Sequence, residues 1–142
     1  MTATRFTTLL IILFLSSTAH GDTATKTDLK QIMQDLQNDT ALIVEGLLVD
    51  DFQTVASAAA RVANHPRIPP SQVALVAAEL GSEMPTFKQY DTLVHDLALS
   101  IGSAAEEGDS TSIADKYQKM LDGCLACHAS YRERVTAVLD SN

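Results

Sequence analysis

The most specific chemistry in the chain belongs to the run Cys124-Leu125-Ala126-Cys127-His128, near the C-terminal end. A Cys-x-x-Cys-His run is the attachment signature of c-type haem, in which two thiols bind the haem covalently and the histidine supplies an iron ligand. On an α-helix, positions i, i+3 and i+4 share a face, so all three side chains can meet one edge of a porphyrin. The motif therefore predicts one covalently bound haem c, attached at Cys124 and Cys127, with His128 as the proximal iron ligand.

Other uses of the two cysteines are less well supported by the rest of the chain. A thioredoxin-like redox pair expects a strand-helix-strand context, and a zinc site expects two further ligands at motif spacing. The chain has no other cysteine, and only three histidines besides the one in the motif. A haem-free helical protein with a disulfide between Cys124 and Cys127 is the alternative hypothesis.

The first residues have the order of a secretory signal. A basic residue precedes an apolar run over residues 6–15, and small and polar residues follow it. The run is shorter than the roughly 20 apolar residues that span a bilayer. We therefore expect residues 1–21 to be a cleavable signal peptide, cut after Ala19 or Gly21, and residues 22–142 to form one exported domain without a stable membrane anchor.

The charge of the chain is strongly acidic, with 18 acidic against 10 basic residues and a formal net charge of −8. This balance argues against nucleic acid as a partner, because phosphates require basic patches. It also argues against binding to anionic membrane surfaces. An acidic surface can steer the protein toward a redox partner with a basic docking face, or serve solubility alone.

Apolar residues recur at spacings of three and four along most of the chain, which is typical of amphipathic helices. The predicted long helices cover residues 28–49, 52–64, 82–108 and 110–138, and a short helix is predicted at 71–80. No segment has the alternating pattern of a strand. Four amphipathic helices with mostly short connections predict an all-α four-helix bundle.

The sequence CLACHASYR, from Cys124 to Arg132, resembles the C-terminal motif of class II c-type cytochromes, the cytochrome c′ family. The resemblance covers roughly residues 28–139, is specific around the motif and elsewhere rests on helix order and spacing. It implies an antiparallel up-down-up-down bundle with haem c attached to the last helix, located in the periplasm. It also implies a homodimer through the first two helices, and the small-residue face of the second helix would permit close packing.

The resemblance assigns roles to residues around the haem. Arg132 matches a basic residue that the family places beside the proximal histidine, where its charge could influence the iron. Tyr131 also fits the family pattern, and we expect it to pack in the core. Many relatives carry an arginine of the first helix near the haem propionates, which this chain lacks, so Lys30 is the predicted propionate partner. Gly123 is expected to give the porphyrin room.

The residue on the distal side of the iron decides between two possible functions, electron transfer and binding of a small gas molecule. Counting along antiparallel first and last helices puts the level of His128 near residues 35–39, within about one 5.4 Å turn. Met33 is the good ligand in that neighbourhood, and as the distal ligand it would give a six-coordinate, low-spin electron carrier with a raised potential. If Leu36 or Thr40 covers the iron instead, it would be five-coordinate and bind nitric oxide or carbon monoxide.

The predicted function is therefore that of a periplasmic monohaem cytochrome carrying single electrons between redox partner proteins. Binding of nitric oxide or carbon monoxide is the alternative within the same family. No nucleophile and base pair, metal triad or phosphate-binding loop accompanies the motif, so the protein is not predicted to be an enzyme.

Overall fold

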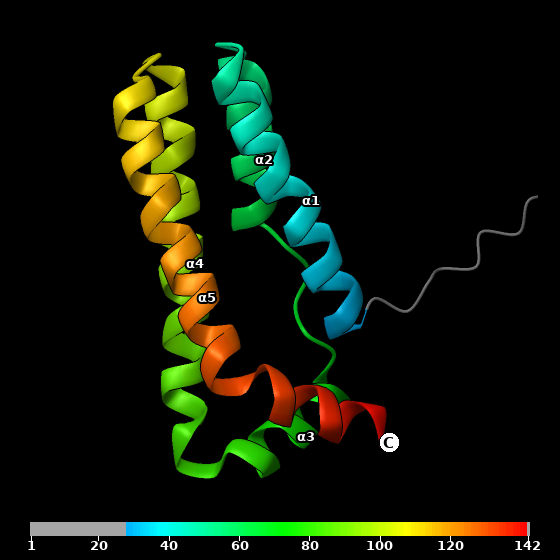
Figure 1. Cartoon of the computed structure of the whole chain (residues 1–142). Helices are drawn as coiled ribbons and strands as arrows, with labels where there is room; N and C mark the ends of the chain where they lie inside the picture. Colours follow the sequence, from blue (N-terminus) through cyan, green and yellow to red (C-terminus); the bar gives the residue numbers. More distant parts are fainter. Residues whose placement is uncertain (1–27, 142) are drawn as a thin grey trace, which may run out of the picture.

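The computed structural model describes residues 28–141, which are almost entirely helical (Figure 1). The elements in chain order are α1 (Leu29–Leu48), α2 (Phe52–Ala63), α3 (Pro70–Leu80), the short 3-10 helix η1 (Gly81–Glu83), α4 (Met84–Glu106) and α5 (Ser110–Asp140). The predicted signal peptide lies outside the described residues. None of the helices in this part of the chain combines the length and the apolar character that a membrane span requires.

The four long helices alternate in direction, so that α1 and α4 run one way and α2 and α5 the other (Figure 1). Within the described range, α2 packs extensively on α1 and on α4, and α4 packs extensively on α5. By contrast, α1 touches α5 only briefly. The all-α, up-down four-helix arrangement predicted from the sequence is confirmed, and its α1–α5 side is the thinly packed one.

Aspartate side chains cap three of the long helices. An oxygen of Asp28 accepts a hydrogen bond from the backbone N–H of residue 31, at 2.8 Å. Asp51 and Asp109 do the same for the starts of α2 and α5, at 3.1 and 2.9 Å. Each cap satisfies a backbone donor that has no partner within its helix, and the negative charge suits the helix N-terminus. The helix boundaries therefore follow closely from local sequence.

The small-residue face of α2 is used inside the molecule. Ala58 and Ala59 have no exposed surface, because they lie in the core between α1 and α4. At Gly46 of α1, a Cβ atom would come within 3.0 Å of both Val55 Cγ2 and the Asp51 carbonyl oxygen, so the glycine allows α1 and α2 to approach closely. This face is therefore not available to a second copy, and a homodimer would need another surface of these helices.

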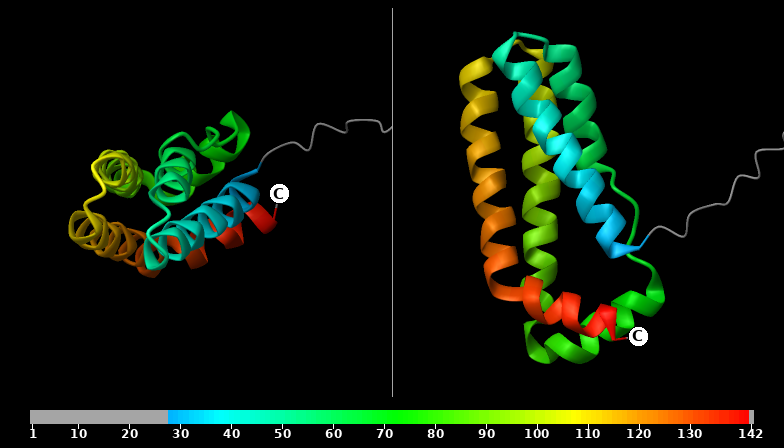
Figure 2. Two further views of the ribbon diagram at one scale, coloured as in Figure 1. Left: turned by 90° about the horizontal axis from the view of Figure 1, so that it is seen from above. Right: turned by 45° about the vertical axis from the view of Figure 1, so that its right-hand side comes forward.

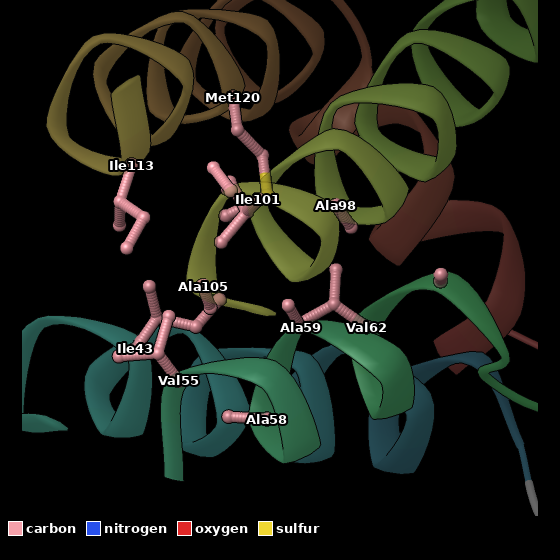
Figure 3. Close-up of a cluster of buried hydrophobic side chains, with 12 residues drawn as sticks. Ile43, Val55, Ala58, Ala59, Val62, Ala98, Ile101, Ala105, Ile113 and Met120 are labelled. Atoms are coloured by element: carbon pink, nitrogen blue, oxygen red, sulfur yellow. The ribbon is translucent and has the colours of Figure 1, made fainter. Parts of the chain in front are cut away.

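Most buried apolar residues of the described range form two separate clusters. The main cluster joins α1, α2, α4 and α5, whose side chains point toward one another in Figure 3. Its largest members are Ile43, Val55, Ile101, Ile113 and Met120. The end cluster lies where α3 packs against the C-terminal part of α5, and its buried members are Leu29, Val76, Leu80, Tyr131 and Val135.

The helix α5 takes part in both clusters. It bends toward its C-terminal end, so that its last turns run across the end of the bundle beside α3 (Figure 2). In this half of the helix, the Ser130 hydroxyl donates to the Ala126 carbonyl at 2.9 Å and the Thr136 hydroxyl donates to the Arg132 carbonyl at 2.8 Å. Such bonds to the preceding turn often accompany helix bends. The bend lets a single helix contribute to both parts of the core.

Candidate haem attachment site

The motif residues lie on α5 between the two clusters. Met120, one turn before the motif, is fully buried in the main cluster, and Tyr131, one turn after it, is buried in the end cluster. Because α5 is helical throughout, Cys124, Cys127 and His128 share one side of it. The candidate site is therefore a seam between two apolar regions.

Both cysteines are free thiols and both are half-buried. Burial raises the pKa of Cys124. Burial also raises the pKa of Cys127, to about 11, and the negative charges of Cys124 and Asp91 nearby add to the effect. At neutral pH both groups are therefore protonated. A redox pair needs a thiol with a lowered pKa, so this environment does not favour thioredoxin-like chemistry.

The side chain of His128 is exposed, and its ring makes no hydrogen bond or ion pair with any residue of the described range. Arg132, one turn further on, is also exposed and forms no ion pair with those residues. Lys30, in the first turn of α1, is likewise exposed and unpaired among them. Within the described residues, no hydrogen bond or ion pair therefore occupies the ring of His128, and no ion pair occupies the charged groups of Arg132 and Lys30.

Met33 is 40% exposed, so it is not the core filler that a helix methionine usually is. The position of Met33 along the bundle axis, relative to α5, follows from the packing of residues before and after it on α1. Leu29 packs in the end cluster with Tyr131, whereas Ile43 packs in the main cluster with Met120. Since α1 and α5 are antiparallel, Met33, which lies about 6 Å beyond Leu29 along the helix axis, falls toward the level of the motif.

The two other residues considered for the distal side are already engaged. Leu36 is half-buried and packs against the main cluster. The Thr40 hydroxyl donates to the Leu36 carbonyl at 2.7 Å, one turn back on its own helix. Of the two, Leu36 is the one whose apolar side chain is directed into the bundle.

Gly123 has a role in helix packing. A Cβ atom at this position would lie 3.1 Å from Leu93 Cδ2, a distance tighter than most Cβ contacts. The missing side chain therefore lets α5 approach α4, and the expected role toward the porphyrin stays a prediction. Tyr131, by contrast, packs as predicted, edge-on to Phe87 and Tyr90 with ring centroids 5.6 and 6.2 Å apart.

Sequence reasoning missed a charge pair close to the motif. His65 Nδ1 donates to the Pro66 carbonyl at 2.8 Å, and His65 Nε2 lies 3.2 Å from a carboxylate oxygen of Asp91. Because both ring nitrogens face acceptors, this arrangement favours the doubly protonated ring. The bond with Asp91 raises the pKa of His65 and lowers that of Asp91. The partners are 26 residues apart, so no local pattern could have revealed the pair.

The remaining histidine of the described range, His95, is hydrogen-bonded within the bundle. His95 Nδ1 donates to the Ala63 carbonyl at 2.7 Å, which ties α4 to the end of α2. This bond gives the ring a structural role in the packing of the two helices.

The residues at the seam suit covalent haem in their chemistry. Two thiols on one helix face can form thioether bonds, and the imidazole of His128 is accessible to an iron atom. Apolar clusters lie before and after the motif along α5, and the thinly packed α1–α5 side adjoins it. The chemistry of the donor set therefore fits haem c.

Comparisons of the chain with protein-family models, with curated proteins and with solved structures found no match. The assignment of the site therefore rests on the motif, its helix and the packing around it.

Proposed function

We propose that this protein is an exported monohaem cytochrome of the class II type, which carries single electrons between redox partner proteins. The observation that supports the proposal is the Cys124, Cys127 and His128 set on one side of α5, between the two apolar clusters. Haem c, when bound, supplies a one-electron iron couple and needs no other reactive group of the protein.

The side chains of α5 would hold the cofactor. Cys124 and Cys127 would hold the haem through thioether bonds, each formed by addition of one S–H across one vinyl group, with the sulfur on one carbon and the hydrogen on the other. The exposed ring of His128 would bind the iron through one nitrogen. The charge of Arg132 would lie beside that ring and favour the reduced, less positive iron. Lys30 would pair with a propionate from the first turn of α1.

Met33 is the proposed distal ligand of the electron carrier. Its side chain is partly exposed, and it lies near the level of the motif. A thioether and an imidazole ligand together would keep the iron six-coordinate in both oxidation states, with a raised potential. A coordination sphere that does not change suits rapid electron exchange.

Binding of nitric oxide or carbon monoxide is the second candidate function. It is supported by Leu36, whose half-buried side chain is directed into the bundle while Met33 is 40% exposed. If Leu36 rather than Met33 covers the iron, the position would stay open to a small diatomic ligand. The ligand set of the iron therefore separates the two candidates.

The proposed compartment is the periplasm. It follows from the signal-like order of residues 1–21 and from the use of both thiols by the cofactor. A homodimer stays a prediction from the resemblance alone.

The first experiment is expression in a host that attaches haem c in its periplasm, followed by denaturation and a pyridine haemochrome spectrum. We expect the haem to stay with the denatured wild-type chain. The double variant Cys124→Ala/Cys127→Ala should lose it, whereas Ser130→Ala, a change on the same helix, should keep it. A wild-type chain without covalent haem and with a disulfide between Cys124 and Cys127 would refute the proposal.

The second experiment identifies the distal ligand by absorption spectra of the oxidised and reduced holoprotein. If Met33 binds the iron, the wild type is low-spin and Met33→Ala converts it to high-spin. Met84→Ala, a change at the start of α4, should leave the spectrum unaltered. A wild type that is already high-spin, and that is unaffected by Met33→Ala, would contradict the electron-carrier assignment and favour gas binding.

A further inference from the structure

A groove of about 390 Å³ lies between α4 and α5, and it is open to solvent. Its lining is mostly apolar and comprises Tyr90, Leu93 and Leu97 of α4 with Lys119, Asp122, Gly123 and Ala126 of α5. Gly123 contributes no side chain, so Leu93 packs directly against the backbone of α5 at this point. The groove is therefore a shallow apolar hollow, with a floor formed by the helix that carries the motif.

The groove is adjacent to the proposed haem attachment. Gly123 and Ala126 immediately precede Cys124 and Cys127 in the chain. A molecule seated in the groove would be separated from the haem-bearing side of α5 by no more than one helix, which with side chains is about 10–12 Å across. Among the surfaces of the bundle, this one offers a short route to the cofactor.

The apolar lining of the groove is partly exposed. Leu93 is 43% exposed and lies beside Tyr90 and Leu97 in the lining. Surface leucines placed singly need no explanation, but an exposed leucine within an apolar groove marks an interaction site. Small contacts of this kind are typical of the transient encounters of electron-transfer proteins.

The charge at the edge of the groove is negative. Lys119, the basic residue in the lining, is neutralised by Asp115, with its Nζ 2.7 Å from a carboxylate oxygen. Asp122, also in the lining, forms no ion pair within residues 28–141. Asp96 also forms no ion pair within residues 28–141, and it lies beside Leu93 on α4, three residues further along the chain. The edge thus has two uncompensated carboxylates around an apolar floor.

We propose that the groove between α4 and α5 is the docking surface for a redox protein that presents an apolar side chain surrounded by lysine or arginine. This inference rests on the proposed electron-carrier function. The apolar floor would receive the side chain, and the two carboxylates would attract and orient the basic residues around it. Such a contact is small, so binding should be weak, rapid and sensitive to salt.

The test uses a lysine-rich class I cytochrome c as the probe. Its reduction by the reduced holoprotein is followed by stopped flow at low salt. We expect Leu93→Ser and Asp122→Asn each to lower the second-order rate constant about fivefold or more. The matched controls are Leu99→Ser, which changes a leucine of α4 that is 49% exposed but outside the groove, and Asp140→Asn, which makes the same charge change at the far end of α5.

A binding readout accompanies the rate measurement. The ¹⁵N-labelled chain is titrated with the zinc-substituted probe, and we expect amide shifts to concentrate at residues of the groove lining and to vanish in 0.5 M salt, where the Debye length falls to roughly 4 Å. Oxidation by ferricyanide should proceed at the wild-type rate in all four variants. Because Asp122→Asn removes no packing, it keeps the test valid if Leu93→Ser destabilises the fold.

Three outcomes would overturn the proposal. Asp122→Asn and Asp140→Asn could slow the reaction equally, which would indicate general electrostatic attraction. The amide shifts could lie elsewhere on the bundle. Sedimentation could show that the chain forms a dimer and that Leu93→Ser dissociates it, which would mean that a second copy covers the groove. Failure of the proposed function is a separate result, because it appears beforehand as the absence of covalent haem.

Discussion

The pair of His65 and Asp91 shows how one residue contact can join distant elements. It connects the segment after α2 to α4, close enough to Cys127 for the Asp91 charge to affect the thiol. Its geometry favours a protonated ring, because both ring nitrogens face acceptors. The pair is therefore a pH-dependent connection beside the candidate site.

The stability of the fold should depend on pH through this pair. The folded-state pKa of His65 is raised above its ordinary 6.5, so its contribution is fully present below pH 6.5 and is lost as the pH rises through the folded pKa. The pKa of Asp91 is lowered from its ordinary 3.8, so its contribution is lost as the pH falls through the folded pKa. Asp91 is 61% exposed, and solvent screening limits the effect to less than about 1 kcal/mol.

Urea unfolding at pH 5.5 and pH 9 measures this dependence. We expect the wild type to lose unfolding free energy between the two values, and His65→Gln or Asp91→Asn to lose less of it. The double variant should behave like either single variant, since each removes the same interaction. Additive effects of the two substitutions would show that the pair is not the cause.

The buried thiol of Cys127 gives a second prediction at this scale. With its pKa raised to about 11, the haem-free chain at pH 8 should react with iodoacetamide at Cys127 roughly a hundredfold more slowly than an unperturbed thiol. Peptide mapping after timed quenching measures the rate. In urea the difference should disappear, because unfolding removes the burial. Equal rates with and without urea would contradict the raised pKa.

At the scale of elements, local sequence predicted the helices better than it predicted their partners. The spacing of apolar residues is a local signal, and it led to nearly correct bounds for the long helices, two of which begin after capping aspartates at positions 51 and 109. The short helix begins at Pro70 rather than Ser71, because proline is favoured in the first turn. The packing of α3 against α5 depends on contacts across the chain, so no local pattern indicated it.

The same distinction applies to the candidate site. Cys124, Cys127 and His128 are neighbours in sequence, so one helical turn sufficed to predict their common side. The contact of Gly123 with α4 was not predicted, because the nearest atom to its missing side chain belongs to Leu93, on another helix. Sequence spacing shows which residues share a helix face, but it does not show which helix that face meets.

Arg134 of α5 forms ion pairs and hydrogen bonds with α3 and with η1, which follows it. Its guanidinium donates to the Glu79 carboxylate at 3.0 Å, to the Glu83 carboxylate at 2.8 Å and to the Glu79 carbonyl at 3.2 Å. Exposed ion pairs add little to global stability, but this fork joins two elements that otherwise meet only at the end cluster. Arg134 therefore orients α3 on the C-terminal part of α5.

Replacing this residue should loosen α3 without unfolding the bundle. In Arg134→Ala we expect faster amide exchange across Pro70–Leu80, with little change in the thermal midpoint of the whole protein. Arg132→Ala removes the same charge two residues away, where no ion pair forms among the described residues, and should leave exchange in α3 unaltered. Unchanged exchange in Arg134→Ala would mean that the apolar contacts alone hold α3.

At the scale of the whole molecule, the bundle is uneven in its packing. The helices α2 and α4 each pack extensively on two neighbours, whereas α1 packs extensively only on α2. An element with few partners opens at a lower free energy than the core of the fold. In the haem-free chain, α1 should therefore be the least protected of the four long helices.

Attachment of haem should change this order, because a macrocycle held by α5 would give α1 a second apolar surface. We expect amide exchange in α1 to slow by roughly tenfold or more between the Cys124→Ala/Cys127→Ala variant and the holoprotein, while exchange in α2 and α4 slows less. Ser130→Ala with haem attached serves as the control and should match the wild type. Equal slowing in all four helices would indicate general stabilisation, and no slowing in α1 would mean that the haem does not contact that helix. The pattern of protection thus tests whether the thin side of the bundle is the side that receives the cofactor.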